Sequence, residues 1–269
     1  MTDRPPPRWP VLRPDWPAPP GIRAVMTLRQ GGVSRPPFDA LNVGARCGDA
    51  PEAVAENRRR IREALRLPSE PCWLTQVHGT EVVSLVRGAE VVSLGDGAEE
   101  GRTVEPPCAD GAVTRTPGRV CAIQVADCLP VLFTARDGAA VGGSHAGWRG
   151  LAAGVLPATV RALAVEPSEL LAWMGPAIGP QHFEVGDEVR TALLAVDGGA
   201  ARAFTPNSRG RWQCDLYEIA RRQLEALGVR EVYGGGWCTY ADPGRFFSYR
   251  RDGRCGRMAA LVWIDEDRH

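Results

Sequence analysis

Short segments rich in valine, leucine, isoleucine and alanine recur along this chain, and they restrict its fold more than any other feature of the sequence. Apolar segments of this length, bounded by glycine, proline and acidic residues, are typical of buried β-strands. We predict strands at 22–28, 72–77, 81–86, 111–114, 120–126, 131–135, 139–144, 170–175 and 257–265. A chain with this pattern must bury its strands in one or more sheets.

Longer segments between these strands carry apolar residues at helical spacing and predict helices over 51–67, 150–164, 184–196 and 214–228. Asp49 and Pro51 have the residue types of an N-cap and a first helical residue. Pro157 is expected to kink the second helix. The last helix is expected to begin after Asp215 and to end at Gly228.

Strands and helices alternate without an internal repeat or a compositional break. We therefore expect an α/β fold (mixed α+β) in a single domain over residues 22–269. The proline-rich segment 1–21 is expected to be an irregular lead-in, and the stretch 95–107, rich in glutamate, glycine and proline, is expected to be a loop.

The charged residues exclude several classes of function. All 32 basic residues are arginine, and 32 acidic residues balance them, so we expect neither a nucleic acid nor a membrane as partner. The absence of lysine excludes Schiff-base enzymes, pyridoxal phosphate enzymes and Walker-A phosphate loops. No secretory or membrane-spanning segment is visible, so a cytoplasmic location is expected, with most of the eight cysteines buried as small apolar residues. Nothing indicates an obligate protein partner.

Three motifs place a metal-ligating residue at the end of an apolar strand: "TQVHG" with His78, "ADCLPV" with Cys128 and "HAGWRG" with His145. Two imidazoles and one thiolate form the three-ligand set that leaves zinc an open fourth position. The spacing matches no compact zinc finger, so the fold would have to assemble the site. The alternative is two hydrogen-bonded core histidines and one buried cysteine without a metal.

Two neighbouring residues favour a reactive site. Asp127 is a carboxylate at the end of the apolar segment "VCAIQVA", where a charge needs a partner or a reaction. Arg149 lies between Gly147 and Gly150 at a predicted helix start. Free backbone N–H groups and a guanidinium together favour an anion such as phosphate.

The sequence also resembles a known family in a series of blocks. These are "TLRQGGVS", "LNVG", "NRRRI", "TQVHG", "VADCLPVLF", "HAGWRG", "MGPAIGPQHFEVG" and "FFSYRRDGRCGRMAAL". They are similar to the blocks of the YfiH-type laccase-domain family, formerly described as multicopper polyphenol oxidases and now as purine nucleoside phosphorylases. The resemblance extends over about residues 22–263.

The resemblance implies mixed β-sheets stacked between flanking helices, and Zn²⁺ held by His78, Cys128 and His145. It implies phosphorolysis of adenosine, inosine, guanosine and methylthioadenosine, with some adenosine deamination, so that purine nucleosides and inorganic phosphate are the expected partners. Some bacterial members are credited with peptidoglycan editing. The pocket residues that it implies are Arg29, Asn42, Gln76, Asp127 and Arg149. His182 departs from the family pattern and is interpreted as a loop residue, with substrate contact as the alternative.

For the mechanism we expect Arg149, joined by Arg29, to bind phosphate and Asp127 to transfer a proton. Zinc deaminases use the glutamate of an H-x-E motif as general acid and base. This chain reads His78-Gly79-Thr80-Glu81, so any deamination here would need a different acid/base residue.

Other classes of site use the same residues. A multicopper laccase needs about ten histidines as copper ligands, and this chain has four. A single blue-copper site would need a weak axial ligand such as methionine, and no methionine flanks the three motifs. Cys128 and His145, oriented by Asp127, could instead form the dyad of a cysteine hydrolase, although His78 would then have no task. A structural zinc in a non-catalytic scaffold would require a fourth ligand, which the motifs do not offer.

Overall fold

The computed structural model describes residues 9–86, 91–93 and 106–266, and their strands form three sheets. The five-stranded sheet has the order β1 (Val11–Leu12), β2 (Ile22–Thr27), β15 (Met258–Ile264), β7 (Val120–Val125) and β3 (Cys72–Trp73). The seven-stranded sheet has the order β14 (Glu231–Gly234), β10 (Leu170–Met174), β8 (Leu129–Ala135), β9 (Val141–Ala146), β6 (Gly111–Thr114), β4 (Val82–Leu85) and β5 (Val91–Ser93). The small sheet has the order β11 (Glu184–Val185), β13 (Trp212–Cys214) and β12 (Phe204–Pro206). Parallel and antiparallel pairs occur in both large sheets.

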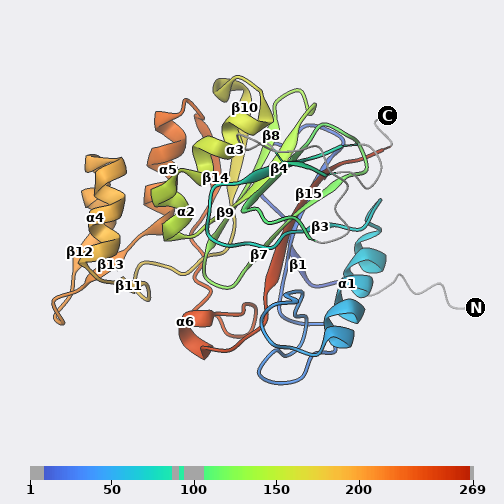
Figure 1. The fold of residues 1–269 in the computed structure, drawn as a ribbon, viewed down its shortest axis with the longest axis horizontal. Helices are drawn as coiled ribbons and strands as arrows, with labels where there is room; N and C mark the ends of the chain where they lie inside the picture. Colours follow the sequence, from blue (N-terminus) through green and yellow to red (C-terminus); the bar gives the residue numbers. More distant parts are fainter. Residues whose placement is uncertain (1–8, 87–90, 94–105, 267–269) are drawn as a thin grey trace, which may run out of the picture.

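Helices cover the outer faces of the two large sheets, which stack on each other (Figure 1). The helices are α1 (Pro51–Leu65), α2 (Trp148–Ala153), α3 (Val155–Leu163), α4 (Asp187–Val196), α5 (Leu216–Ala226) and α6 (Tyr249–Asp252). Helix α1 packs on the five-stranded sheet, and α2, α3 and α5 lie on the far side of the seven-stranded sheet. The expected arrangement of mixed sheets between flanking helices, in a single domain, is confirmed.

Strand β15 shows how the sequence builds these layers. Its alternate residues Met258, Ala260 and Val262 point into the core between the sheets, while Leu261 and Trp263 join the cluster under α1. This two-residue period is that of a strand buried on both faces. The segment is apolar at every position because one face of the strand packs in the core between the sheets and the other face packs under α1.

Several expected elements differ in detail. Ala50, not Asp49, is the N-cap of α1, because the Asp49 carboxylate accepts hydrogen bonds from Ser34 and Asn42 instead. The helix predicted over 150–164 is in fact two helices, α2 and α3, and the break lies at Gly154, whose φ of 98° suits glycine. Pro157 does not kink a helix, because it lies in the first turn of α3, where its missing N–H is not needed.

The lead-in and the segment 184–196 also carry strands. Val11 and Leu12 form a two-residue strand that pairs with β2, whereas the rest of the described lead-in, residues 9–21, is irregular as expected. The segment 184–196 opens with β11 before α4 begins. The predicted loop 95–107 lies, up to residue 105, outside the described residues. In the part of the chain that the structure describes, no helix is long and apolar enough to cross a membrane.

Two of the connections that carry the chain between the large sheets contain a residue with positive φ next to or within the site motifs. The segment between β3 and β4 contains His78, with φ of 63°, and the segment between β7 and β8 contains Asp127, with φ of 97°. Positive φ values are rare for residues other than glycine and often mark functional sites. Both crossings lie at the same end of the sheets, where His145 ends β9, and this end positions the site described next.

Candidate metal centre

His78, Cys128 and His145 come together at this end of the sheets. Their ligand atoms all lie within 4.8 Å of one another, and the Cys128 Sγ lies 3.7 Å from the His78 Nε2. Four-coordinate zinc places neighbouring sulfur and nitrogen ligand atoms about 3.6 Å apart. The donor set and its spacing therefore fit a tetrahedral metal with one position left for substrate or water. His78 is exposed, whereas His145 is buried, so the site opens on one side.

A buried carboxylate that the sequence did not reveal, Asp110, holds two of the three ligands in place. It precedes β6, opposite the end of β9, and its Oδ1 lies 2.8 Å from the His145 Nδ1. Its two oxygens also accept hydrogen bonds from the backbone N–H groups of Val77, His78 and Gly79, at 2.7–3.1 Å. The contact with Asp110 leaves the His145 Nε2 for a metal. Such carboxylate–histidine pairs orient metal ligands in many zinc sites.

The charges of these groups depend on one another. Burial alone would raise the pKa of Asp110, but hydrogen bonds from His145 and Gly79 outweigh it and hold the pKa below its ordinary value. Burial would also raise the pKa of Cys128, yet His145 and His78 lower that pKa to about 6. For His145, burial opposes the charge, but the Cys128 thiolate and Asp110 raise the pKa to about 9. The Cys128 thiol therefore loses its proton more readily than a free cysteine, and the thiolate is the form that binds a metal.

Gly147, at the N-cap of α2, is small because the ligands are close. A Cβ at this position would lie 2.8 Å from the Cys128 Sγ and 3.2 Å from the His78 Cδ2. Its φ of −69° suits any residue, so space and not backbone conformation requires glycine here. The first glycine of "HAGWRG" thus lets the thiolate and imidazole approach each other.

The three ligands open into a cavity of about 720 Å³. Arginines dominate its charged lining: Arg46, Arg58, Arg149, Arg250 and Arg257. Aromatic residues also line it: Trp73, Trp148, Phe183 and Tyr249. Among the described lining residues, Asp127 is the sole carboxylate. A cavity with these walls suits a ligand that combines a flat ring with a negative charge.

Three of the expected pocket residues, Gln76, Asp127 and Arg149, line this cavity beside the ligands. Arg149 is exposed and its guanidinium lies 4.3 Å from the centre of the Trp148 ring; no hydrogen bond or ion pair to a described residue engages it. Gln76 also lines the cavity, but its amide exchanges two hydrogen bonds of 2.8 Å with the backbone of Gln124 in β7.

Asp127 lines the cavity as well, and both its oxygens have donors. Oδ1 accepts a hydrogen bond from the Thr239 hydroxyl and Oδ2 from the backbone N–H of Arg250, each at 2.6 Å. These contacts tie the residue before Cys128 to the start of α6, which carries Tyr249 and Arg250. They position the cavity wall, and the expected role in proton transfer stays a prediction.

Arg29 and Asn42 lie outside the cavity lining. Arg29 donates hydrogen bonds to the carbonyl groups of Asp39 and Pro243, and Asn42 is fully buried, where it bonds to Gly44 and Asp49 and accepts from the N–H of Arg257. These contacts fasten loops that surround the site. Their expected contact with substrate stays a prediction.

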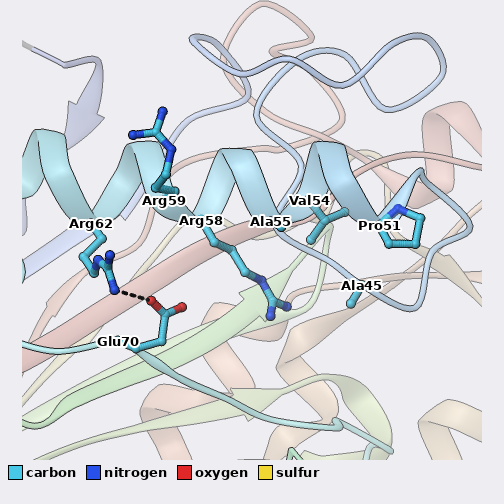
Figure 2. Close-up of a pocket in the computed structure, with 8 residues that line it drawn as sticks. All are labelled: Ala45, Pro51, Val54, Ala55, Arg58, Arg59, Arg62 and Glu70. Atoms are coloured by element: carbon cyan, nitrogen blue, oxygen red, sulfur yellow. Dashed lines mark hydrogen bonds and ion pairs between the residues drawn. The ribbon is translucent and has the colours of Figure 1, made fainter.

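A smaller cavity of about 420 Å³ runs along α1 and shares Ala45 and Arg58 with the larger one (Figure 2). Its arginines already have partners. Arg58 donates to the carbonyl of Val43, Arg59 pairs with Glu56 and Glu63, and Arg62 pairs with Glu70. An anion in this cavity would have to compete with these contacts, unlike one beside Arg149.

Comparison with known proteins agrees with this geometry. Residues 23–265 match the family model described as "Multi-copper polyphenol oxidoreductase laccase". The chain is 49% identical over 254 residues to the purine nucleoside phosphorylase YfiH of Escherichia coli (strain K12), covering 94% of this chain and 98% of that protein. It is 51% identical over 256 residues to a purine nucleoside phosphorylase of Pseudomonas aeruginosa, with coverage of 95% and 98%.

Solved structures share the fold. A Neisseria meningitidis protein of the DUF152 family, NMB0706, superposes with a TM-score of 0.85 at 43% identity, covering 95% of this chain and 99% of that one. YlmD from Geobacillus stearothermophilus superposes with a TM-score of 0.82 at 34% identity, with coverage of 91% and 93%. The chain therefore belongs to the YfiH/DUF152 family of laccase-like domains.

Proposed function

We propose that this protein is a zinc-dependent purine nucleoside phosphorylase that converts adenosine, inosine, guanosine and methylthioadenosine to the free base and ribose 1-phosphate. The observation that carries the proposal is the joining of a three-ligand metal site and a cavity lined by arginines and aromatic rings. A metal hydrolase that uses bound water needs no anion site of this kind. The names of the curated relatives support the same reaction.

In this proposal the chain's own residues bind and orient the reactants. Arg149, exposed and without a protein acceptor among the described residues, is free to bind the attacking phosphate. The aromatic residues of the cavity offer faces to the purine. Asp127 keeps Arg250 and Tyr249 against the cavity through its hydrogen bonds with Thr239 and the α6 backbone. Zinc held by His78, Cys128 and His145 would supply a Lewis acid or activate a water.

Adenosine deamination is proposed as a side activity of the same metal. Glu81, the nearest glutamate after His78, is exposed and lies outside the cavity lining, so it is not placed to act as the acid/base of an H-x-E deaminase. Conversion of adenosine to inosine would therefore need another proton carrier.

Product analysis with and without phosphate tests the reaction class. A phosphorylase converts inosine and phosphate to hypoxanthine and ribose 1-phosphate, and adenosine supplied in parallel reveals any deamination as inosine. Release of hypoxanthine with free ribose at an undiminished rate in phosphate-free buffer would show a hydrolase instead. Consumption of oxygen without either product would indicate copper redox chemistry.

The thiolate–imidazolium pairing of Cys128 and His145 favours a second candidate, a cysteine or zinc hydrolase that acts on a substrate such as a peptidoglycan precursor. The phosphate test above separates a zinc hydrolase from the phosphorylase, and a cysteine hydrolase differs from both in needing no metal. A chelator that removes the metal should abolish phosphorolysis, whereas a cysteine hydrolase would keep its activity.

A further inference from the structure

A second pair of a cysteine and a histidine lies away from the metal ligands. The Cys238 Sγ lies 3.4 Å from the His182 Nδ1, although the two residues are 56 positions apart in the sequence. The backbone N–H of Gly179 donates a hydrogen bond to the same sulfur at 3.2 Å. Neither residue lines the metal cavity. His182, which the sequence marked as unusual for the family, thus has a chemical partner.

The histidine ring is held in place by an aromatic neighbour. Tyr240 stacks on His182 with ring centres 4.5 Å apart and planes inclined by 20°. A ring held in this way keeps one nitrogen directed at the sulfur. The backbone N–H of Gly179, three residues before His182 in the same turn, also donates to the sulfur and holds it beside the ring.

Most other thiols of the chain lack these features. Cys121, Cys214 and Cys255 are buried, and burial raises the pKa of Cys214 to about 12 and of Cys255 to about 11. Cys238 and His182 are partly exposed, so a small reagent can reach them. Cys108 is exposed, and no histidine hydrogen-bonds to it among the described residues. It therefore provides a reference thiol in the same molecule.

We propose that Cys238 is an oxidative modification site for small hydroperoxides, with His182 as its base. His182 takes the thiol proton, and the sulfur attacks one oxygen of the peroxide. The S–O bond forms, the O–O bond breaks, and the leaving hydroxide takes the proton from His182 to become water. Sulfur loses two electrons, the peroxide gains two, and the product is a sulfenic acid.

The position of the pair gives the modification a path to the metal cavity. Thr239, the next residue, donates through its hydroxyl to Asp127, and Asp127 adjoins Cys128. The backbone N–H of Ile178, next to Gly179, donates to the carbonyl of Asp127 at 2.9 Å, so both segments that flank the sulfur bond to Asp127. The sulfenic acid would therefore form between two segments that support the cavity wall.

Site-resolved labelling of the intact, metal-loaded protein tests the proposal without using enzyme activity. Protein at about pH 7 is exposed to limiting hydrogen peroxide, sulfenic acid is trapped with dimedone, and peptides are quantified by mass spectrometry. Because the His182 nitrogen can take the thiol proton during the attack and no described histidine contacts Cys108, we expect Cys238 to react about tenfold faster than the more exposed Cys108. Cys238→Ser should remove the signal and identify the site.

Variants of His182 decide the role of the base. His182→Gln should lower the ratio of Cys238 to Cys108 labelling about tenfold, and His182→Phe, which keeps an aromatic ring on Tyr240, should do the same. Gln181→Ala, an exposed neighbour in the same loop, should leave the ratio unchanged and serves as the matched control. A general loss of structure would be recognised in the same molecules, because it would expose the buried thiols of Cys121 and Cys214 to labelling. An unchanged ratio in both His182 variants, or slower labelling of Cys238 than of Cys108 in the parent, would overturn the proposal.

Discussion

Cys128 and Cys238 each have an imidazole nitrogen near the sulfur, at 3.7 Å and 3.4 Å respectively, yet their surroundings differ. Cys128 has two histidines, and the buried carboxylate of Asp110 stands behind one of them. Cys238 has one histidine, backed by the ring of Tyr240, and a single N–H donor. No buried carboxylate orients His182 among the described residues.

The difference shows what turns a cysteine–histidine contact into a metal site. A metal needs several donors held in one geometry, and Asp110 supplies this by bonding to His145 and to the segment that carries His78. A single pair held by stacking offers a base for a thiol but no coordination shell. Four changes would break or sharpen this contrast.

Loss of the thiolate should have the largest effect. Cys128→Ser replaces a strong zinc ligand by a weak one, so we expect the variant to lose its metal and its phosphorolysis while the fold survives. Elemental analysis measures the zinc content, and circular dichroism shows whether the fold survives. Cys238→Ser is the matched control and should keep both metal and activity. Full zinc retention in Cys128→Ser would remove Cys128 from the ligand set.

Asp110→Asn should have the next largest effect. It removes the charge that orients His145 and weakens the hold on the segment of His78, so we expect the metal affinity to fall about 10- to 100-fold. Competition with a chelator of known affinity measures this. Glu81→Gln changes an exposed carboxylate in the same segment and should leave the affinity unchanged. Equal affinities in all three proteins would make Asp110 a purely structural residue.

The pH dependence of metal binding should follow the charges of the empty site. Since the pKa of His145 is raised to about 9, a metal must displace a proton from it at neutral pH. The apparent affinity should therefore rise about tenfold per pH unit between about pH 7 and pH 9 and then level off. Below the pKa of Cys128, about 6, a second proton competes and the dependence becomes steeper. A flat titration between pH 7 and 9 would contradict the protonated state of His145.

Arg149→Lys should have the smallest effect. It changes the cavity into which the metal ligands open and which Cys238 and His182 do not line. The change keeps the charge but loses the planar fork, so we expect a several-fold higher KM for phosphate with unchanged zinc content. Arg161→Lys, on the exposed face of α3 and outside the cavity lining, is the matched control. The same KM in both variants would assign Arg149 to packing against Trp148.

The strands, the long helices and the three ligands could be predicted because their signals are local or belong to recognisable motifs. A continuous apolar run defines β15, and Asp215 caps α5 as expected, accepting from the N–H groups of Tyr217 and Glu218. Each ligand lies in a distinctive motif. In the structure His78 and Cys128 lie in the connections after β3 and β7, His145 lies at the end of β9, and the three come together.

The role of Asp110 could not be predicted, because it depends on the register of two strands. Asp110 and His145 are 35 residues apart and meet only because Gly111 pairs with Ser144. Asp110 and Asp127 carry the same local signal, a carboxylate next to an apolar strand, and this signal does not distinguish a residue that orients a ligand from one that fastens a loop. Arg29 and Asn42 illustrate the same limit, since a motif does not tell whether a polar side chain faces a ligand or its own loops.

The central place of β15 has a consequence for synthesis on the ribosome. This strand is the last along the chain, yet it lies between β2 and β7 and pairs with both. Until residues 258–264 leave the exit tunnel, β2 and β7 each present an unpaired edge and the core between the sheets lacks one wall. A chain truncated before this strand is therefore expected to aggregate.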